Sequence, residues 1–231
     1  DLYAPNGKGY RYGPSIIQNE DGTIDLWAVS NANNIEWDYI VYYHFDGESW
    51  SDEKIVLEPS KYTFDHYSVC DPGVIYFNGY YYLGYTSTIV DTNSGINNNV
   101  FVARSKNPDG PYEKWNGDGW GNDPYPIIYY NENDDCWGAG EVSFVIKDEQ
   151  LYCYYTWNCN DGNYTKLSIA DLSDEWPKTL KEVGDVYAHN TQDSIDVAYV
   201  PEYDKFIAIT TENRFTTNSG IDILESNDGT R

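Results

Sequence analysis

Apolar and polar residues alternate in short runs along the whole chain, the period-2 pattern of β-strands that bury one face. The pattern is clear in VFVARS (100–105) and KLSIADL (166–172). Helical periodicity longer than two turns is found nowhere in the sequence. The alternation therefore predicts an all-β protein.

One unit recurs four times: an opening residue, a short apolar strand, a turn, and a second strand rich in aromatic residues. The openings lie at Gly13, Asp71, Glu141 and Asp196, about 55 to 70 residues apart. A period of this length indicates an array of sheet modules. Further β-type runs follow each hairpin, and in the second module these are NNVFVARS and PIIYY (126–130). Modules of four antiparallel strands predict the blades of a β-propeller.

The repeat divides a single domain, residues 1–231, into four blades. Their approximate ranges are 10–60, 68–130, 138–190 and 194–231. The fourth module reaches its third strand at GIDILES (220–226), and four-bladed closure is uncommon. We expect a five-bladed domain that continues beyond this segment.

Composition narrows the choice of partners. The chain has 14 basic and 38 acidic residues, a formal charge of −24, which repels phosphate backbones and disfavours nucleic acid. No apolar run approaches the roughly 18 residues of a membrane span. The acidity is typical of a secreted protein, and the absence of methionine and of a signal peptide indicates a processed segment of a longer, extracellular polypeptide.

The cysteines and the acidic loops leave alternatives open. No CxxC pair is present, and three full disulfide pairings are possible. A disulfide between Cys70 and Cys136 and buried free thiols are both compatible with the sequence. Residues 131–137 and 158–163 are rich in oxygen ligands and could hold a structural calcium ion, although neither has the spacing of a calcium loop. No cofactor is expected to be required. The four cysteines are Cys70, Cys136, Cys153 and Cys159.

Three of the four openings are carboxylates, and propeller geometry brings strand openings to one end of the axis. The loops between second and third strands share that face and are rich in Asn, Thr and Ser, which suits the hydroxyl groups of a sugar. These loops are residues 31–37, 87–99, 158–165 and 212–220. The candidate sugar-binding residues around them are His66, Tyr67, Trp137, Trp157 and Arg214.

Two segments carry a resemblance to a known family. SVCDPGVIYFNGYYYLGYTS and GAGEVSFVIKDEQLYCYYTW resemble the second-blade and third-blade signatures of the five-bladed propeller glycosidases typified by glycoside hydrolase family 43. Members of that family typically remove arabinofuranosyl or xylosyl units from plant hemicellulose with inversion. They use an Asp in blade one as general base, an Asp in blade two to orient and tune, and a Glu in blade three as general acid.

The resemblance assigns the acid to Glu141 and the tuning carboxylate to Asp71. A carboxylate beside a general acid raises the pKa of that acid by disfavouring a second negative charge. The first opening departs from the family pattern, because Gly13 stands where the base is expected. Asp196, Asp38 and Asp65 are the candidate replacements, and catalysis by a single acid with assistance from the substrate is the other catalytic alternative.

The resulting expectation is a glycoside hydrolase that cleaves arabinosyl or xylosyl linkages in plant-type polysaccharide such as xylan. The alternative is a non-catalytic propeller that binds glycan or serves as a structural module in an extracellular assembly. A third option is phosphorolysis, which requires a basic pocket. The candidate arginines for such a pocket are Arg11, Arg104 and Arg214.

Overall fold

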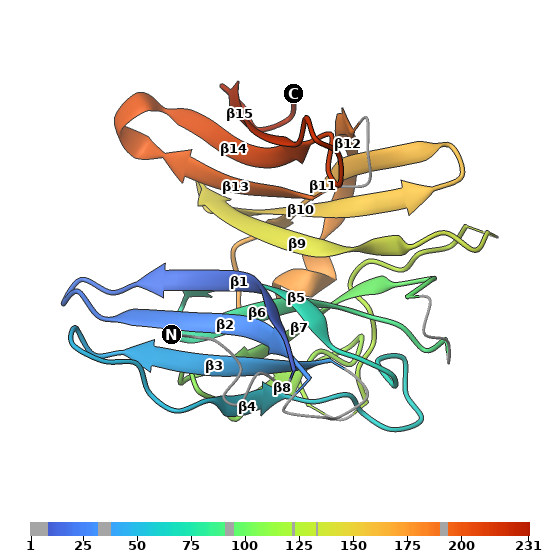
Figure 1. Cartoon of the computed structure of the whole chain (residues 1–231). Helices are drawn as coiled ribbons and strands as arrows, with labels where there is room; N and C mark the ends of the chain where they lie inside the picture. Colours follow the sequence, from blue (N-terminus) through green and yellow to red (C-terminus); the bar gives the residue numbers. More distant parts are fainter. Residues whose placement is uncertain (1–8, 32–37, 91–94, 122, 133, 190–193) are drawn as a thin grey trace.

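The fold is an all-β propeller of four blades, seen in a computed structural model (Figure 1). The structure describes residues 9–31, 38–90, 95–121, 123–132, 134–189 and 194–231. The two asparagine-rich loops at 31–37 and 87–99 therefore lie partly outside the described residues. In the part that is described, no helix has the length and apolar character needed to cross a membrane.

Each blade is an antiparallel sheet whose strands follow chain order from the centre outward. Blade one comprises β1 (Arg11–Gln18), β2 (Ile24–Ser30), β3 (Tyr39–Phe45) and β4 (Lys54–Leu57). Blade two comprises β5 (Cys70–Phe77), β6 (Tyr80–Ser87), β7 (Asn99–Ser105) and β8 (Glu113–Lys114). Blade three comprises β9 (Gly138–Lys147), β10 (Gln150–Cys159), β11 (Gly162–Asp171) and β12 (Lys181–His189). Blade four comprises β13 (Ile195–Val200), β14 (Lys205–Glu212) and β15 (Gly220–Ser226).

Short turns fix the hairpins. Asn78 and Gly79 join β5 to β6 with φ angles of 50° and 78°, the paired positive values of a tight hairpin turn. Asp148 and Glu149 join β9 to β10 in the same way, with φ angles of 52° and 61°. The inner hairpin of each of these blades is thus set by two turn residues.

The predicted outer strand of blade two is wrong. PIIYY (126–130) was expected to form it, but the fourth strand is the short β8, and Ile128 makes only an isolated bridge to Val100. Ile127 and Ile128 pack instead against the cores that join blades two and three. The apolar run is therefore explained by packing between blades.

The hydrophobic core lies between neighbouring blades. Trp27 and Phe101 are fully buried in the cluster that joins blades one and two. Trp176 is fully buried between blades two and three, and Phe206 packs in the cluster that joins blades three and four. The inner strands β1, β5, β9 and β13 contact one another in that order, which places their openings around one site.

Candidate active site

A cavity of about 690 Å³ lies where the four inner strands open. Each blade contributes a short stretch of its inner strand, so the cavity occupies the axis of the propeller. The lining residues are 12–16, 71–74, 141–144 and 194–197, together with Thr211 and Arg214. The expected convergence of the strand openings on one place is confirmed.

The first three openings share a backbone device. In β1, β5 and β9 the register shifts at the opening, so that two residues oppose one on the second strand. The first residue of each bulge is left-handed, with φ of 55° at Gly13, 49° at Asp71 and 52° at Glu141. A bulge of this kind usually carries glycine at that position.

Asp71 and Glu141 thus occupy positions that favour glycine. A left-handed non-glycine residue costs about 1–3 kcal/mol, and such strain is concentrated at functional sites. Both residues also bring a carboxylate into the same cavity. Their backbone conformation therefore points to a role that outweighs this cost.

The Asp71 carboxylate is held in a confined position. Cys70 Sγ lies 3.3 Å from Asp71 Oδ2 as a donor, and the Thr86 side chain also hydrogen-bonds the carboxylate. Burial raises the pKa of Asp71 above its ordinary value, while the positive charge of Arg214 acts in the opposite direction. The site therefore favours the protonated form of Asp71 more than water does.

Glu141 is positioned by two threonines. Thr156 Oγ1 donates a hydrogen bond of 2.7 Å to Glu141 Oε2, and the Glu141 amide donates to Thr86 Oγ1 at 2.9 Å. The Thr86 hydroxyl therefore links the side chain of Asp71 to the backbone of Glu141. This arrangement fixes the two acids relative to each other.

Asp196 lines the cavity, but its predicted equivalence to Asp71 and Glu141 is wrong. The described part of β13 pairs with β14 without a bulge, and Asp196 lies opposite Ile209. The hydrogen bonds between blades give the correct alignment: Ser15 Oγ accepts from the Val74 amide, as Ser143 Oγ does from the Val197 amide.

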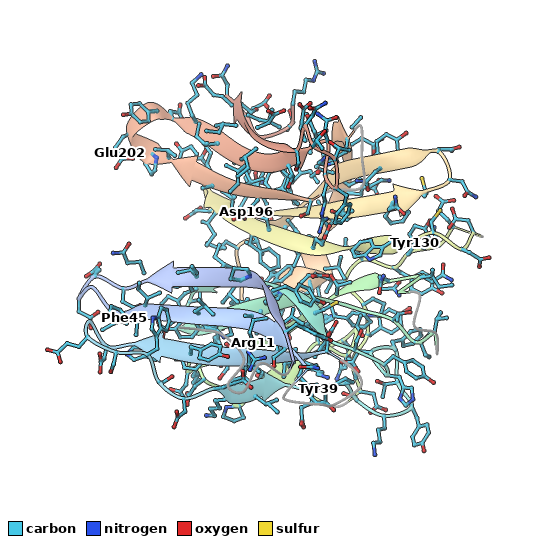
Figure 2. The ribbon with its side chains drawn as sticks, in the orientation of Figure 1. Arg11, Tyr39, Phe45, Tyr130, Asp196 and Glu202 are labelled. Carbon is cyan, nitrogen blue, oxygen red and sulfur yellow. The ribbon has the colours of Figure 1, made fainter. Side chains whose placement is uncertain are left out.

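That alignment places Ser194 at the fourth opening, two residues before Asp196. Asp196 corresponds in position to Ser143, and Ser143 Oγ donates to its Oδ1 at 2.7 Å. Figure 2 shows Asp196 on β13, beside β9. Its carboxylate is therefore tied to the strand that carries Glu141.

The aromatic candidates differ in their surroundings. Trp157 is 7% exposed and packs against Tyr130, with ring centroids 4.8 Å apart, so it belongs to the core. Trp137 precedes β9 and packs closely against Gly140, next to Glu141. Figure 2 shows Tyr130 at the β9 side of the molecule. None of these three aromatic rings lines the cavity in the described part of the chain.

His66 and Tyr67 lie together on the connection between β4 and β5. Their rings meet edge to face with centroids 4.4 Å apart, and His66 Nδ1 accepts a hydrogen bond of 2.6 Å from the Tyr62 amide. The Tyr67 amide bonds the Thr88 carbonyl near the end of β6. Their role in sugar binding stays a prediction.

Asp65 is excluded as a base by its surroundings. It is fully buried, forms a 2.5 Å ion pair with Lys114, and accepts a hydrogen bond from Tyr85. Asp38 differs, because it is partly exposed and accepts hydrogen bonds from Tyr10 and Tyr12, of which Tyr12 lines the cavity.

The arginines offer little support for a phosphate pocket. Arg11 pairs with Glu53, and Arg104 forms a 2.7 Å ion pair with Glu113 while stacking on Tyr80. Arg214 lines the cavity and lies over the Phe215 ring at 4.8 Å. Only one of the three candidate arginines is thus at the site.

The cysteines are free thiols, so the structure contains no disulfide between Cys70 and Cys136. Asp134, from the predicted calcium segments, bonds the Tyr130 hydroxyl and the amides of Cys136 and Asn160. Asn133 lies outside the described residues. Within the described ranges no group of three or more His, Cys, Asp or Glu side chains is placed to hold a metal ion.

Thr86, Thr156 and Tyr12 were missed by the sequence analysis. The threonines had a visible signal, because GYTS, YYTW and ITTE place a threonine at the same point of each second strand. Thr211, the third of these, lines the cavity. No sequence pattern pointed to Tyr12, because its hydrogen-bond partner Asp38 is 26 residues away, on the connection between β2 and β3.

Comparison with known proteins supports the architecture. No family model matches the chain, and no curated protein matches it. Solved structures do. A family 117 glycoside hydrolase from the marine bacterium Zobellia galactanivorans is similar with a TM-score of 0.72 and 18% identity over 98% of this chain and 69% of that one.

Two further structures extend this likeness. An endo-arabinase from Bacteroides thetaiotaomicron matches with a TM-score of 0.64 and 17% identity, over 94% of this chain and 76% of that one. An α-L-arabinofuranosidase from Clostridium thermocellum matches with a TM-score of 0.65 and 16% identity, over 95% and 69%. At these identities the likeness shows the propeller fold.

Proposed function

We propose that this protein is a glycoside hydrolase that cleaves arabinosyl or xylosyl linkages of plant-type polysaccharide. The observation that carries the proposal is the pair of acids at equivalent bulges, Asp71 and Glu141. Both have a left-handed backbone conformation, and both line the axial cavity. The similar structures include an endo-arabinase and an α-L-arabinofuranosidase, which favours arabinosyl linkages.

Glu141 is the proton donor to the leaving glycosidic oxygen in this proposal. Thr156 donates a hydrogen bond to Glu141 Oε2 and so fixes the orientation of the carboxyl group. Asp71 orients Glu141 and tunes its pKa, with Thr86 fixing the position of Asp71 relative to Glu141. A positioned general acid contributes about 10²- to 10⁴-fold to the rate.

The test is release of sugar from aryl arabinofuranosides and xylosides, comparing the protein with Glu141→Gln. On substrates whose leaving group must be protonated, we expect Glu141→Gln to be at least about 100-fold slower than the unaltered protein. A dinitrophenol leaving group departs without a proton, so on that substrate the rate should fall much less. Equal rates for the protein and the variant on a poor leaving group would remove Glu141 from the mechanism.

A second function is favoured by one specific observation. Gly13 occupies the first bulge, so no carboxylate is supplied there. A propeller that binds glycan without cleaving it fits this feature. Saccharide binding measured by calorimetry, without release of reducing sugar over prolonged incubation, would decide for the binding module.

A further inference from the structure

The first blade supplies a tyrosine and a carboxylate beside the bulge that lacks an acid. Tyr12 lines the cavity immediately before Gly13, and its hydroxyl donates a 2.7 Å hydrogen bond to Asp38 Oδ2. Tyr10 donates to the other oxygen, Oδ1. The carboxylate is thus held by two tyrosine O–H groups, one from β1 and one from the residue just before it.

Asp38 is fixed to the rest of the site through its backbone. Its carbonyl accepts a 3.1 Å hydrogen bond from the Val69 amide, two residues before Asp71. Its negative charge also acts on Asp71. Burial is the main cause that raises the pKa of Asp71, and the charge of Asp38 raises it further. Asp38 therefore lies close to the acids of the cavity, one hydrogen bond behind Tyr12.

The position of Asp38 suits a base better than that of Asp196. Tyr12 and Glu141 both line the cavity and come from blades that are separated by blade two. An inverting hydrolase requires its base on the opposite side of the sugar from its acid, with room for a water molecule. Asp196 instead lies beside β9, bonded to Ser143. It is next to the acid's own strand and not opposite it.

We propose that Tyr12 and Asp38 together form the general base of this enzyme. This inference rests on the proposed glycosidase function. A tyrosine hydroxyl both donates and accepts, and Tyr12, with its donor directed to Asp38, keeps its oxygen lone pairs for water. Tyr12 as a whole residue is 41% exposed, so part of it is open to water.

The step balances with one proton moved along the pair. Water attacks the anomeric carbon as the bond to the leaving oxygen breaks, and it gives a proton to Tyr12 Oη. The original Tyr12 proton passes to Asp38 Oδ2, and Glu141 gives its proton to the leaving oxygen. Asp38 ends protonated and Glu141 ionised, and exchange with solvent restores both.

Gly13 makes a direct test possible. A Cβ built there would lie 3.7 Å from Asp71 Oδ1 and 3.8 Å from Asp71 Cα, which are ordinary contacts. Its φ of 55° matches the values that Asp71 and Glu141 already adopt. The variant Gly13→Asp can therefore place a carboxylate directly in the cavity, where it could accept a proton from water without Tyr12 and Asp38.

The experiment compares Tyr12→Phe, Asp38→Asn and their double variant on an aryl glycoside that the protein cleaves. We expect each single variant to lose about 100-fold or more in kcat/KM and the double variant to lose no more than either. Sodium azide, an anionic nucleophile that needs no base, should restore turnover and give the glycosyl azide of inverted configuration. Gly13→Asp in the Asp38→Asn background should recover at least tenfold.

Tyr10→Phe is the matched control, because it removes an O–H donor from the same carboxylate on a ring outside the described cavity lining. A smaller loss is expected. Near-normal turnover by Asp38→Asn or Tyr12→Phe, with Glu141→Gln inactive, would overturn the relay and leave the glycosidase proposal standing. No turnover by the unaltered protein on any glycoside would overturn the glycosidase proposal itself, and the relay with it.

Discussion

Thr156 Oγ1 donates a 2.7 Å hydrogen bond to Glu141 Oε2, from the second strand of the blade to the bulge of the first. Thr156 is 4% exposed, so the bond is shielded from water. Blade two repeats the device, since Thr86 hydrogen-bonds the Asp71 carboxylate. A threonine on the second strand thus holds the acid of its own blade.

Replacing Thr156 by valine should slow catalysis more than it destabilises the fold. Valine has the same shape but removes the Thr156 donor from Glu141 Oε2. Glu141 becomes ionised as it gives up its proton, and a hydrogen bond to a charged group is worth about 1.5–3 kcal/mol. We expect kcat/KM on the aryl glycosides to fall about 10- to 100-fold. Thr165→Val is the control, because Thr165 is equally buried in blade three but bonds His189. Equal losses in both variants would contradict a specific role for Thr156.

The fold and the place of Asp71 and Glu141 in the cavity could be predicted from the sequence, because strand alternation, turns and aromatic second strands are local properties. The fourth opening could not. An offset of two residues leaves the alternation unchanged, so DVAY matched DPGV at Asp196 while the structure places Ser194 there. Only the bulges and the bonds between blades reveal the true alignment.

The partners of the acids were hidden for a related reason. Tyr12 and Asp38 are brought together by the pairing of β1, β2 and β3, which no short motif records. Trp157 was selected for its aromatic ring near polar loops, yet packing against Tyr130 and Lys166 keeps it in the core. Side-chain direction relative to the cavity depends on register and twist, and residue type does not specify it.

Asp71→Asn should abolish activity and stabilise the protein at neutral pH. Burial raises the pKa of Asp71 above its ordinary value of 3.8, so the native state binds the proton more tightly than the unfolded state. Stability from this group is present below the unfolded pKa and is lost as pH rises through the folded pKa. Asparagine carries no charge and so removes that loss. The thermal midpoint of Asp71→Asn should therefore exceed that of the unaltered protein at pH 7, and the two midpoints should approach each other in acid.

Asp204→Asn is the matched control for this variant. Asp204 has the same φ of 49°, but its hydrogen bond with Lys147 lowers the pKa of its carboxyl. The sign is therefore opposite: stability from Asp204 is present above its unfolded pKa and is lost as pH falls. A lower midpoint for Asp71→Asn at pH 7 in thermal scans would show that burial of the charge is not the dominant effect.

Gly73→Ala should weaken the contact between blades two and three. A Cβ at Gly73 would lie 2.0 Å from the Val142 carbonyl oxygen, a backbone atom next to Glu141. The strands must separate to accept it, which costs about 1–3 kcal/mol and displaces Glu141. We expect lower stability in urea and reduced kcat together. Gly220→Ala, in β15 with open space around it, should change unfolding by less than about 0.5 kcal/mol.

Lys114→Met tests the buried ion pair beneath the connection that carries His66. Lys114 Nζ lies 2.5 Å from Asp65 Oδ2, and the two side chains are 10% and 0% exposed. Removing one partner leaves an uncompensated buried charge, so the free energy of unfolding should fall by about 3–5 kcal/mol. The double variant with Asp65→Leu removes both charges and should recover part of the loss in urea titrations. If the double variant is as unstable as the sum of the two single variants, Asp65 and Lys114 do not act as a pair.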